Sequence, residues 1–361
     1  MNKENKLNKV AFGIYFFIAI CFVAIRMLSA FNLLSFLSGW TGYIFSFVIQ
    51  VVLLFGGSVF VFSALMKKKP KETFSVYKFK KISSRSVIIS ILIGCVVFFL
   101  NIFISSFFNS IISGLGYKSE STIISNSDGY YPFWLFIVNI IFTAVLPAIC
   151  EETAHRGMIL NASSKFGIFK AILISSLMFG LLHLNIEQFF YATIIGVFLG
   201  YITTLTGSIY PAMIVHFMNN ALSVFLSFSR VRGLGFASIF SKIALMFDKS
   251  ILIGLLFSVS AFVLLIFLLK WLTKILFIST FRDMAIEGKK SLEKFLLRQN
   301  FFNGTDQPGQ TKVIELTDKD LMRFFQGQKL AKMDGLTKIF FSLTIIMTGV
   351  LTIFTFVWGV L

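Results

Sequence analysis

The segment Val87–Ile112, VIISILIGCVVFFLNIFISSFFNSII, contains no charged side chain, and it decides the fold class. A helix that crosses a lipid bilayer needs about 20 predominantly apolar residues. Strands of a membrane barrel would alternate apolar and polar residues with a period of two, whereas this run is apolar at odd and even positions alike. The segment therefore predicts a membrane-spanning helix.

Runs of the same kind recur on both sides of this segment. Over the whole chain 57% of the residues are hydrophobic and 14% are charged, whereas soluble domains have about 45–50% and about 25%. We predict an all-α, polytopic transmembrane helical bundle of about eight to nine membrane helices. The apolar segments lie near 10–30, 43–65, 87–112, 132–150, 171–186, 188–206, 209–228, 251–271 and 336–360. The fifth is short and holds polar groups, so it is expected to be a partial or buried helix.

The chain divides into five parts by hydrophobicity. The predicted parts are N-terminal transmembrane helices (1–130), a membrane core that holds the polar motifs (131–228), a membrane-surface segment with a further transmembrane helix (229–271), a cytoplasmic insertion (272–335) and a C-terminal transmembrane helix (336–361). The insertion is predicted from its mixed charge and its cluster of turn residues.

The net charge of +17 can indicate nucleic-acid binding. The cations lie between apolar runs, however, as in the cytoplasmic loops of membrane proteins. We therefore expect a lipid bilayer and no nucleic acid as a partner, and a multi-pass protein with a cytoplasmic N-terminus. The richness in Lys, Ile, Asn and Phe favours a bacterial plasma membrane. The three cysteines form no CxxC pair, which argues against a disulfide framework.

Ionisable residues inside membrane helices are costly and are therefore functional candidates. In the stretch Glu151–Arg156, EETAHR, Glu152 and Arg156 are four residues apart and can pair on one helical face. Glu151 lies about 100° further round the helix and can face a different environment. The alternative is a helix end at the membrane interface with solvated charges, near the cytoplasmic end of the fourth span.

Two more polar patterns follow within apolar runs. Phe179–His183, FGLLH, places a histidine in a membrane helix, where it either serves chemistry or only hydrogen-bonds a neighbouring helix. His216 and Asn220 of HFMNN share a helical face and can donate to an oxyanion, or act as polar contacts between helices. Together Glu151, His183, His216 and Asn220 suggest an activated water attacking a carbonyl, since no GxSxG or HExxH occurs.

In their order and spacing, EETAHR, FGLLH and HFMNN resemble the EExxxR, FxxxH and HxxxN motifs of the CPBP family. That family includes type II CAAX prenyl endopeptidases and bacterial proteins linked to bacteriocin processing or self-immunity. The resemblance covers roughly 135–228. It implies that Glu151 activates water, that His183 positions it, and that His216 and Asn220 stabilise the oxyanion. Supporting roles are implied for Glu152, Arg156 and Phe179.

The resemblance leaves metal dependence open. Glu151, His183 and His216 can bind Zn²⁺ with water in the fourth position, and a metal-free glutamate and histidine site can perform the same chemistry. His155 occupies a variable position of its motif and is expected to be peripheral. The expected function is intramembrane hydrolysis of membrane-associated peptides or proteins, as in CAAX-like processing, bacteriocin maturation or self-immunity, in a cavity open to the cytoplasmic side. The alternatives are a catalytically silent immunity or signalling scaffold and, third, a transporter.

Overall fold

The computed structural model describes residues 3–37, 39–118, 131–240, 242, 250–286 and 333–360. Every regular element in these ranges is helical, so the predicted all-α class is confirmed. The elements are α1 (Lys3–Ala30), α2 (Trp40–Phe47), η1 (Val48–Val61), α3 (Phe62–Met66), α4 (Pro70–Val76), α5 (Ser84–Gly114), α6 (Phe133–Asn139), η2 (Ile140–Val145), α7 (Leu146–Glu152), η3 (Thr153–Leu160), α8 (Asn161–Ser163), η4 (Ser164–Phe166), α9 (Ile168–Leu182), α10 (Ile186–Thr206), α11 (Tyr210–Arg232), α13 (Ile251–Ile286) and α16 (Gly335–Val360).

Within the described residues, eight helical rods are long and apolar enough to cross a membrane. Two of them are composite. Trp40–Met66 joins α2, η1 and α3, and Phe133–Phe166 joins α6 to η4 through the π-helical stretches η2 and η3. A π-helical turn is wider than an α-helical one and is frequent at functional sites. The chain is therefore a multi-pass membrane protein.

The fourth predicted span is too short. The helix does not end near residue 150 but continues to Phe166, so Glu151 and Glu152 lie inside it rather than at a cytoplasmic end. The physical reason is that Glu152 and Arg156 satisfy each other in the protein interior, where they are 0% and 1% exposed. The alternative of solvated charges at a helix end is therefore wrong for this segment.

The fifth predicted segment is a short helix, as expected. α9 has 15 residues and lies below the length of a full span. It turns back at residues 183–185 and packs along α10 as a helical hairpin. Glycines permit the close approach: Gly196 and Gly200 of α10 face Ser176 and Ile172 of α9.

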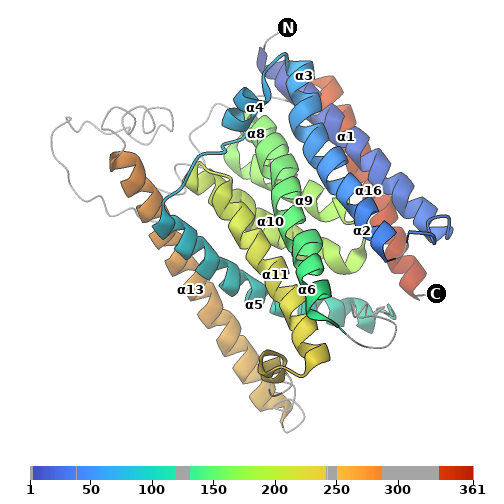
Figure 1. Cartoon of the computed structure of the whole chain (residues 1–361), viewed down its shortest axis with the longest axis vertical. Coiled ribbons are helices and arrows are strands. Elements are labelled where there is room, and N and C mark those ends of the chain that lie inside the picture. The colour runs from blue at the N-terminus through green and yellow to red at the C-terminus, as the bar shows by residue number, and fades with distance from the viewer. Residues whose placement is uncertain are drawn as a thin grey trace.

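The helices form two groups around the motif-bearing core (Figure 1). On one side, buried side chains of α1, η1 and α3 pack against η3 and α9, and α16 packs on α1. On the other side, α5 and α13 pack against α10 and α11. The N-terminus and α4 lie at one end of the bundle, and the C-terminus of α16 lies at the opposite end (Figure 1). α13 extends into the predicted insertion as far as Ile286, and residues 287–332 lie outside the described part.

Candidate active site

The first part of the site is a buried ion pair on the long fourth rod. Arg156 Nη1 donates to Glu152 Oε1 at 3.0 Å, one helical turn earlier. Arg156 Nη2 donates to the carbonyl oxygen of Gly196 at 3.0 Å, which ties the rod to α10. The guanidinium also lies 4.6 Å from the ring centroid of Phe179. Charge, hydrogen bonds and an aromatic face thus compensate for the desolvation of Arg156.

Glu152 links this pair to the third motif. Its Oε1 atom is 2.8 Å from Nδ1 of His216, which comes from α11. Because a carboxylate can only accept, His216 Nδ1 is the donor, and Nε2 is the nitrogen left for chemistry. That Nε2 atom lies 3.9 Å from Oε2 of Glu151. Glu151 is the more accessible carboxylate, since its side chain is 20% exposed and that of Glu152 is 0% exposed.

His183 directly follows α9, and like His216 it has one ring nitrogen bonded inside the protein. Its Nδ1 atom is 2.9 Å from the carbonyl oxygen of Phe179, so Nδ1 donates and Nε2 is again the remaining nitrogen. The next residue, Leu184, has φ +50°, a left-handed conformation that is uncommon for residues other than glycine. This turn carries the chain from α9 into α10 and leaves His183 at the tip of the hairpin.

Glu151 and His183 meet at a pocket of about 300 Å³. The walls are largely apolar and come from α1, η1 and α9, with Arg26 as the cation. The residues of α1 in the wall lie in its last third, Phe22 to Ser29, so the pocket extends toward the end of the bundle away from the N-terminus. We predicted a cavity open to the cytoplasmic side, and the side of the membrane that this pocket faces stays a prediction, whereas Glu151 lies within its helix rather than at its end.

Asn220 takes part in a separate chain of polar side chains. Its Nδ2 atom donates to the carbonyl oxygen of Thr143 at 3.0 Å, and its Oδ1 atom accepts from Asn219 at 2.9 Å. Asn219 in turn accepts from Asn101 of α5 at 3.2 Å. The sequence interpretation missed Asn101 and Asn219, although a polar residue within an apolar span was the signal that selected His216.

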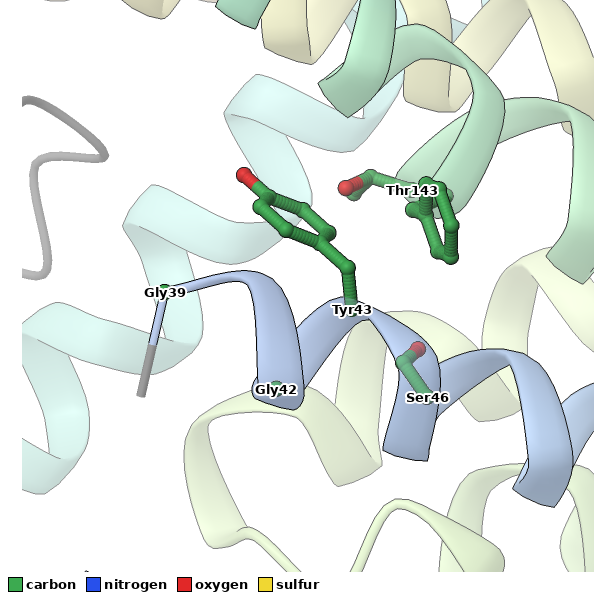
Figure 2. A pocket seen from close by; sticks show the side chains of 6 residues that line it. Gly39, Gly42, Tyr43, Ser46 and Thr143 are labelled. Carbon is green, nitrogen blue, oxygen red and sulfur yellow. The ribbon is translucent and has the colours of Figure 1, made fainter. Parts of the chain in front are cut away.

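A second pocket, of about 350 Å³, lies between α2 and η2. Figure 2 shows Tyr43 and Ser46 rising from α2, with Thr143 on the facing helix. Thr143 belongs to the wall of this pocket, and its carbonyl oxygen holds Asn220. The structure thus brings Glu151, His183 and His216 together, and it connects Asn220 to the neighbouring pocket.

His155 lies in the wall of the first pocket, and its functional role stays a prediction. It is 0% exposed and lines the pocket with Glu151 and His183. Its Nδ1 atom is 2.7 Å from the carbonyl oxygen of Glu151. Phe179 connects all three histidines, because its ring makes edge contacts with His155 at 4.9 Å, His183 at 5.0 Å and His216 at 5.7 Å between centroids.

The proposed zinc ligands do not assemble as a metal site. In the part of the chain that the structure describes, no three His, Cys, Asp or Glu side chains are grouped so that they could hold a metal ion. The geometry of Glu151, His183 and His216 therefore does not fit the ligand set that the resemblance allowed, and the metalloprotease type is unsupported.

The comparison with protein families agrees with the motifs. The family model described as type II CAAX prenyl endopeptidase, Rce1-like, matches residues 132–222. This range contains all three motifs and both carboxylates. The curated proteins and the solved structures give no match to this chain. The predicted resemblance is confirmed: at residues 132–222 the chain carries an Rce1-like domain of the type II CAAX prenyl endopeptidases, consistent with a CPBP-family intramembrane protease.

Proposed function

We propose that this protein is an intramembrane endopeptidase in which Glu151 activates a water molecule to cleave membrane-associated peptides or proteins. The observation that carries the proposal is the 3.9 Å separation between Glu151 Oε2 and His216 Nε2 beside the first pocket. This distance is too long for a direct hydrogen bond. It suits a water molecule that binds both atoms.

The reaction needs one proton carrier. Glu151 takes a proton from the water as its oxygen bonds to the substrate carbonyl carbon, and returns it to the amine nitrogen when the C–N bond breaks. His216 Nε2 accepts a hydrogen bond from the second O–H of the water and orients the water, and this hydrogen stays on the oxygen. Glu152 keeps His216 in the tautomer that makes this possible, because its carboxylate occupies Nδ1.

The developing oxyanion needs donors. His183 has Nε2 without a hydrogen-bond partner in the described part of the chain, and this atom donates when the ring is protonated. Asn220 uses one N–H on Thr143 and has a second one to offer. We assign the oxyanion to His183, because Asn220 is connected to the neighbouring pocket. His216 is thereby moved from the oxyanion to the water, relative to the role that the family resemblance implied.

The apolar walls of the pocket favour a hydrophobic substrate segment. CAAX-like tails and precursors of secreted bacterial peptides both present such segments, and we include both in the proposal. Self-immunity against a bacteriocin would follow from cleavage of that peptide in a bacterial plasma membrane.

The test is cleavage of a panel of both substrate types by purified protein in detergent or vesicles. Glu151→Gln is expected to lower the rate about 10²–10⁴-fold, the usual contribution of a general base. Glu72→Gln is the matched control, because Glu72 is exposed on α4 and should leave the rate unchanged. Wild-type activity in Glu151→Gln would overturn the assignment.

The same cleavage assay with a strong zinc chelator tests whether the activity requires a metal ion. Activity that survives a strong zinc chelator would agree with the lack of a metal cluster among the described residues. Loss that added Zn²⁺ restores would favour the metal-dependent alternative. No cleavage of any substrate by wild type would leave the scaffold hypothesis in its place.

A further inference from the structure

Both ring nitrogens of His155 are bonded inside the protein. Nδ1 lies 2.7 Å from the carbonyl oxygen of Glu151, and Nε2 lies 2.8 Å from the hydroxyl of Tyr15. Tyr15 belongs to α1, 140 positions earlier in the chain and outside the residues that match the family model. Both side chains are 0% exposed. An N-terminal helix with no motif of its own therefore contacts the candidate active site.

The main-chain partner fixes the hydrogen on Nδ1 of His155. A carbonyl oxygen can only accept, so His155 Nδ1 carries a hydrogen. In the neutral ring Nε2 is then an acceptor, and it lies 2.8 Å from the Tyr15 hydroxyl. Tyr15 donates its one hydroxyl hydrogen to the carbonyl oxygen of Met178 at 2.9 Å, so Nε2 and this oxygen share that hydrogen, and Tyr15 also contacts α9. His155 is thus held at both ends and has no nitrogen free for substrate or metal.

The position of His155 matters because its ring is bonded to the main chain of Glu151. π-helical geometry begins at Thr153, directly after the two glutamates, and the ring of His155 within it reaches back to the carbonyl of Glu151. Ser175 of α9 donates to the carbonyl oxygen of His155 at 2.9 Å. The ring edge also packs against Phe179. These contacts and the Tyr15 bond hold His155 in place, and the Nδ1 bond of His155 connects it to the main chain of the residue proposed to activate water.

We infer that Tyr15 and His155 form a positioning pair that sets the main-chain position of Glu151. The inference rests on the proposed function, and it adds Tyr15, outside the matched family range, and His155, at a variable position of the first motif. It predicts that breaking the Nδ1 bond lowers turnover more than substrate binding, because the carboxylate loses its alignment while the pocket walls stay in place.

The pair can be tested without any substrate. The chain has three histidines, so protein labelled with ¹⁵N-histidine gives three sets of imidazole signals. His155→Asn identifies the set of His155 by its loss. Tyr15→Phe is expected to shift the Nε2 signal of that set and to leave its Nδ1 signal protonated. Unchanged signals in Tyr15→Phe would overturn the pair whatever the protein cleaves.

Two substitutions separate the bonds kinetically. Asn places an amide near the Nδ1 position and can still donate to Glu151, whereas Gln places it near Nε2 and can only reach Tyr15. We expect His155→Asn to stay within about 3-fold of wild-type kcat, and His155→Gln to fall by about 10-fold or more at unchanged KM.

If both variants lose kcat equally, and if these losses follow the decreases in their thermal midpoints, the role of His155 is merely structural and the inference is overturned. If wild type cleaves nothing, the proposed function has failed. The NMR experiment then decides by itself whether Tyr15 and His155 form the pair.

Discussion

Arg156 shows how a charge can be accommodated inside this bundle. It is 1% exposed, and its two terminal nitrogens are bonded to Glu152 and to the carbonyl oxygen of Gly196. Removing one member of a buried ion pair leaves the other charge without compensation, which typically costs about 3–5 kcal/mol. The stability of the core therefore depends on both members of the pair being present.

Arg156→Met is accordingly expected to lower the free energy of unfolding by about 3–5 kcal/mol. Thermal unfolding in detergent, followed by circular dichroism, checks this. Arg156→Lys should recover little, since one ammonium cannot make the bonds of a planar guanidinium to two partners. The double variant Glu152→Gln/Arg156→Met is the decisive comparison. It should be more stable than Arg156→Met alone, because neither charge remains buried; a double variant that is less stable would contradict the argument.

Site contacts between residues close in the sequence could be predicted, whereas contacts between distant residues could not. Spacing of four residues predicts the contact between Glu152 and Arg156, because a helix places such residues on one face. No spacing rule relates Tyr15 to His155 or Asn101 to Asn219, which are 140 and 118 positions apart. Their contacts exist only after α1 and α5 have packed on the core, so they could not be read from the sequence.

At the scale of elements, the α9–α10 hairpin decides where His183 lies. A Cβ atom on Gly180 would overlap Thr193 Oγ1 and lie 2.9 Å from the carbonyl oxygen of Phe189. Since the second obstacle is backbone, a rotamer change in Thr193 cannot relieve the contact. The helices must move apart, and the tip that carries His183 moves with them.

Gly180→Ala is therefore expected to destabilise the protein by about 1–3 kcal/mol, the usual cost of overpacking, and to lower cleavage activity. Gly349→Ala is the matched control. Gly349 also lies within a helix, α16, and a Cβ atom there would meet nothing within 4 Å. Alanine favours the helix at that position by up to about 1 kcal/mol. Equal thermal midpoints for Gly180→Ala and Gly349→Ala would contradict this, because α9 and α10 could then move apart without loss of stability.

Element types were more predictable than element boundaries. Long apolar runs predict membrane helices, and the short fifth run predicts a short helix. The extension of the fourth rod to Phe166 was not predicted, because the charges of residues 151–156 resemble a helix end until their interior partners are known. The π-helical stretches have no sequence period that distinguishes them from α-helix.

At the scale of the whole molecule, charge is concentrated at one end. The segment that joins α3 to α5 carries seven lysines, Arg85 follows in the first turn of α5, and the segment lies at the same end as the N-terminus (Figure 1). Residues 233–240, which follow α11, lie at the opposite end (Figure 1). The excess of cations predicts that the N-terminal end faces the cytoplasm. The first pocket, whose α1 wall runs from Phe22 to Ser29, then extends toward the external side.

Cysteine labelling tests this orientation in intact cells. Ser75 and Ser238 are both exposed, Ser75 at the N-terminal end and Ser238 in the connection that follows α11. With an impermeant maleimide, Ser238→Cys should label in intact cells and Ser75→Cys only after permeabilisation. The unsubstituted protein is the control, because its three cysteines lie in the membrane rods. The reverse labelling pattern would mean that the N-terminal end faces outward and that the first pocket extends toward the cytoplasm. Cytoplasmic tails would then be the accessible substrates, whereas the expected pattern favours peptides that reach the site from the outer half of the bilayer.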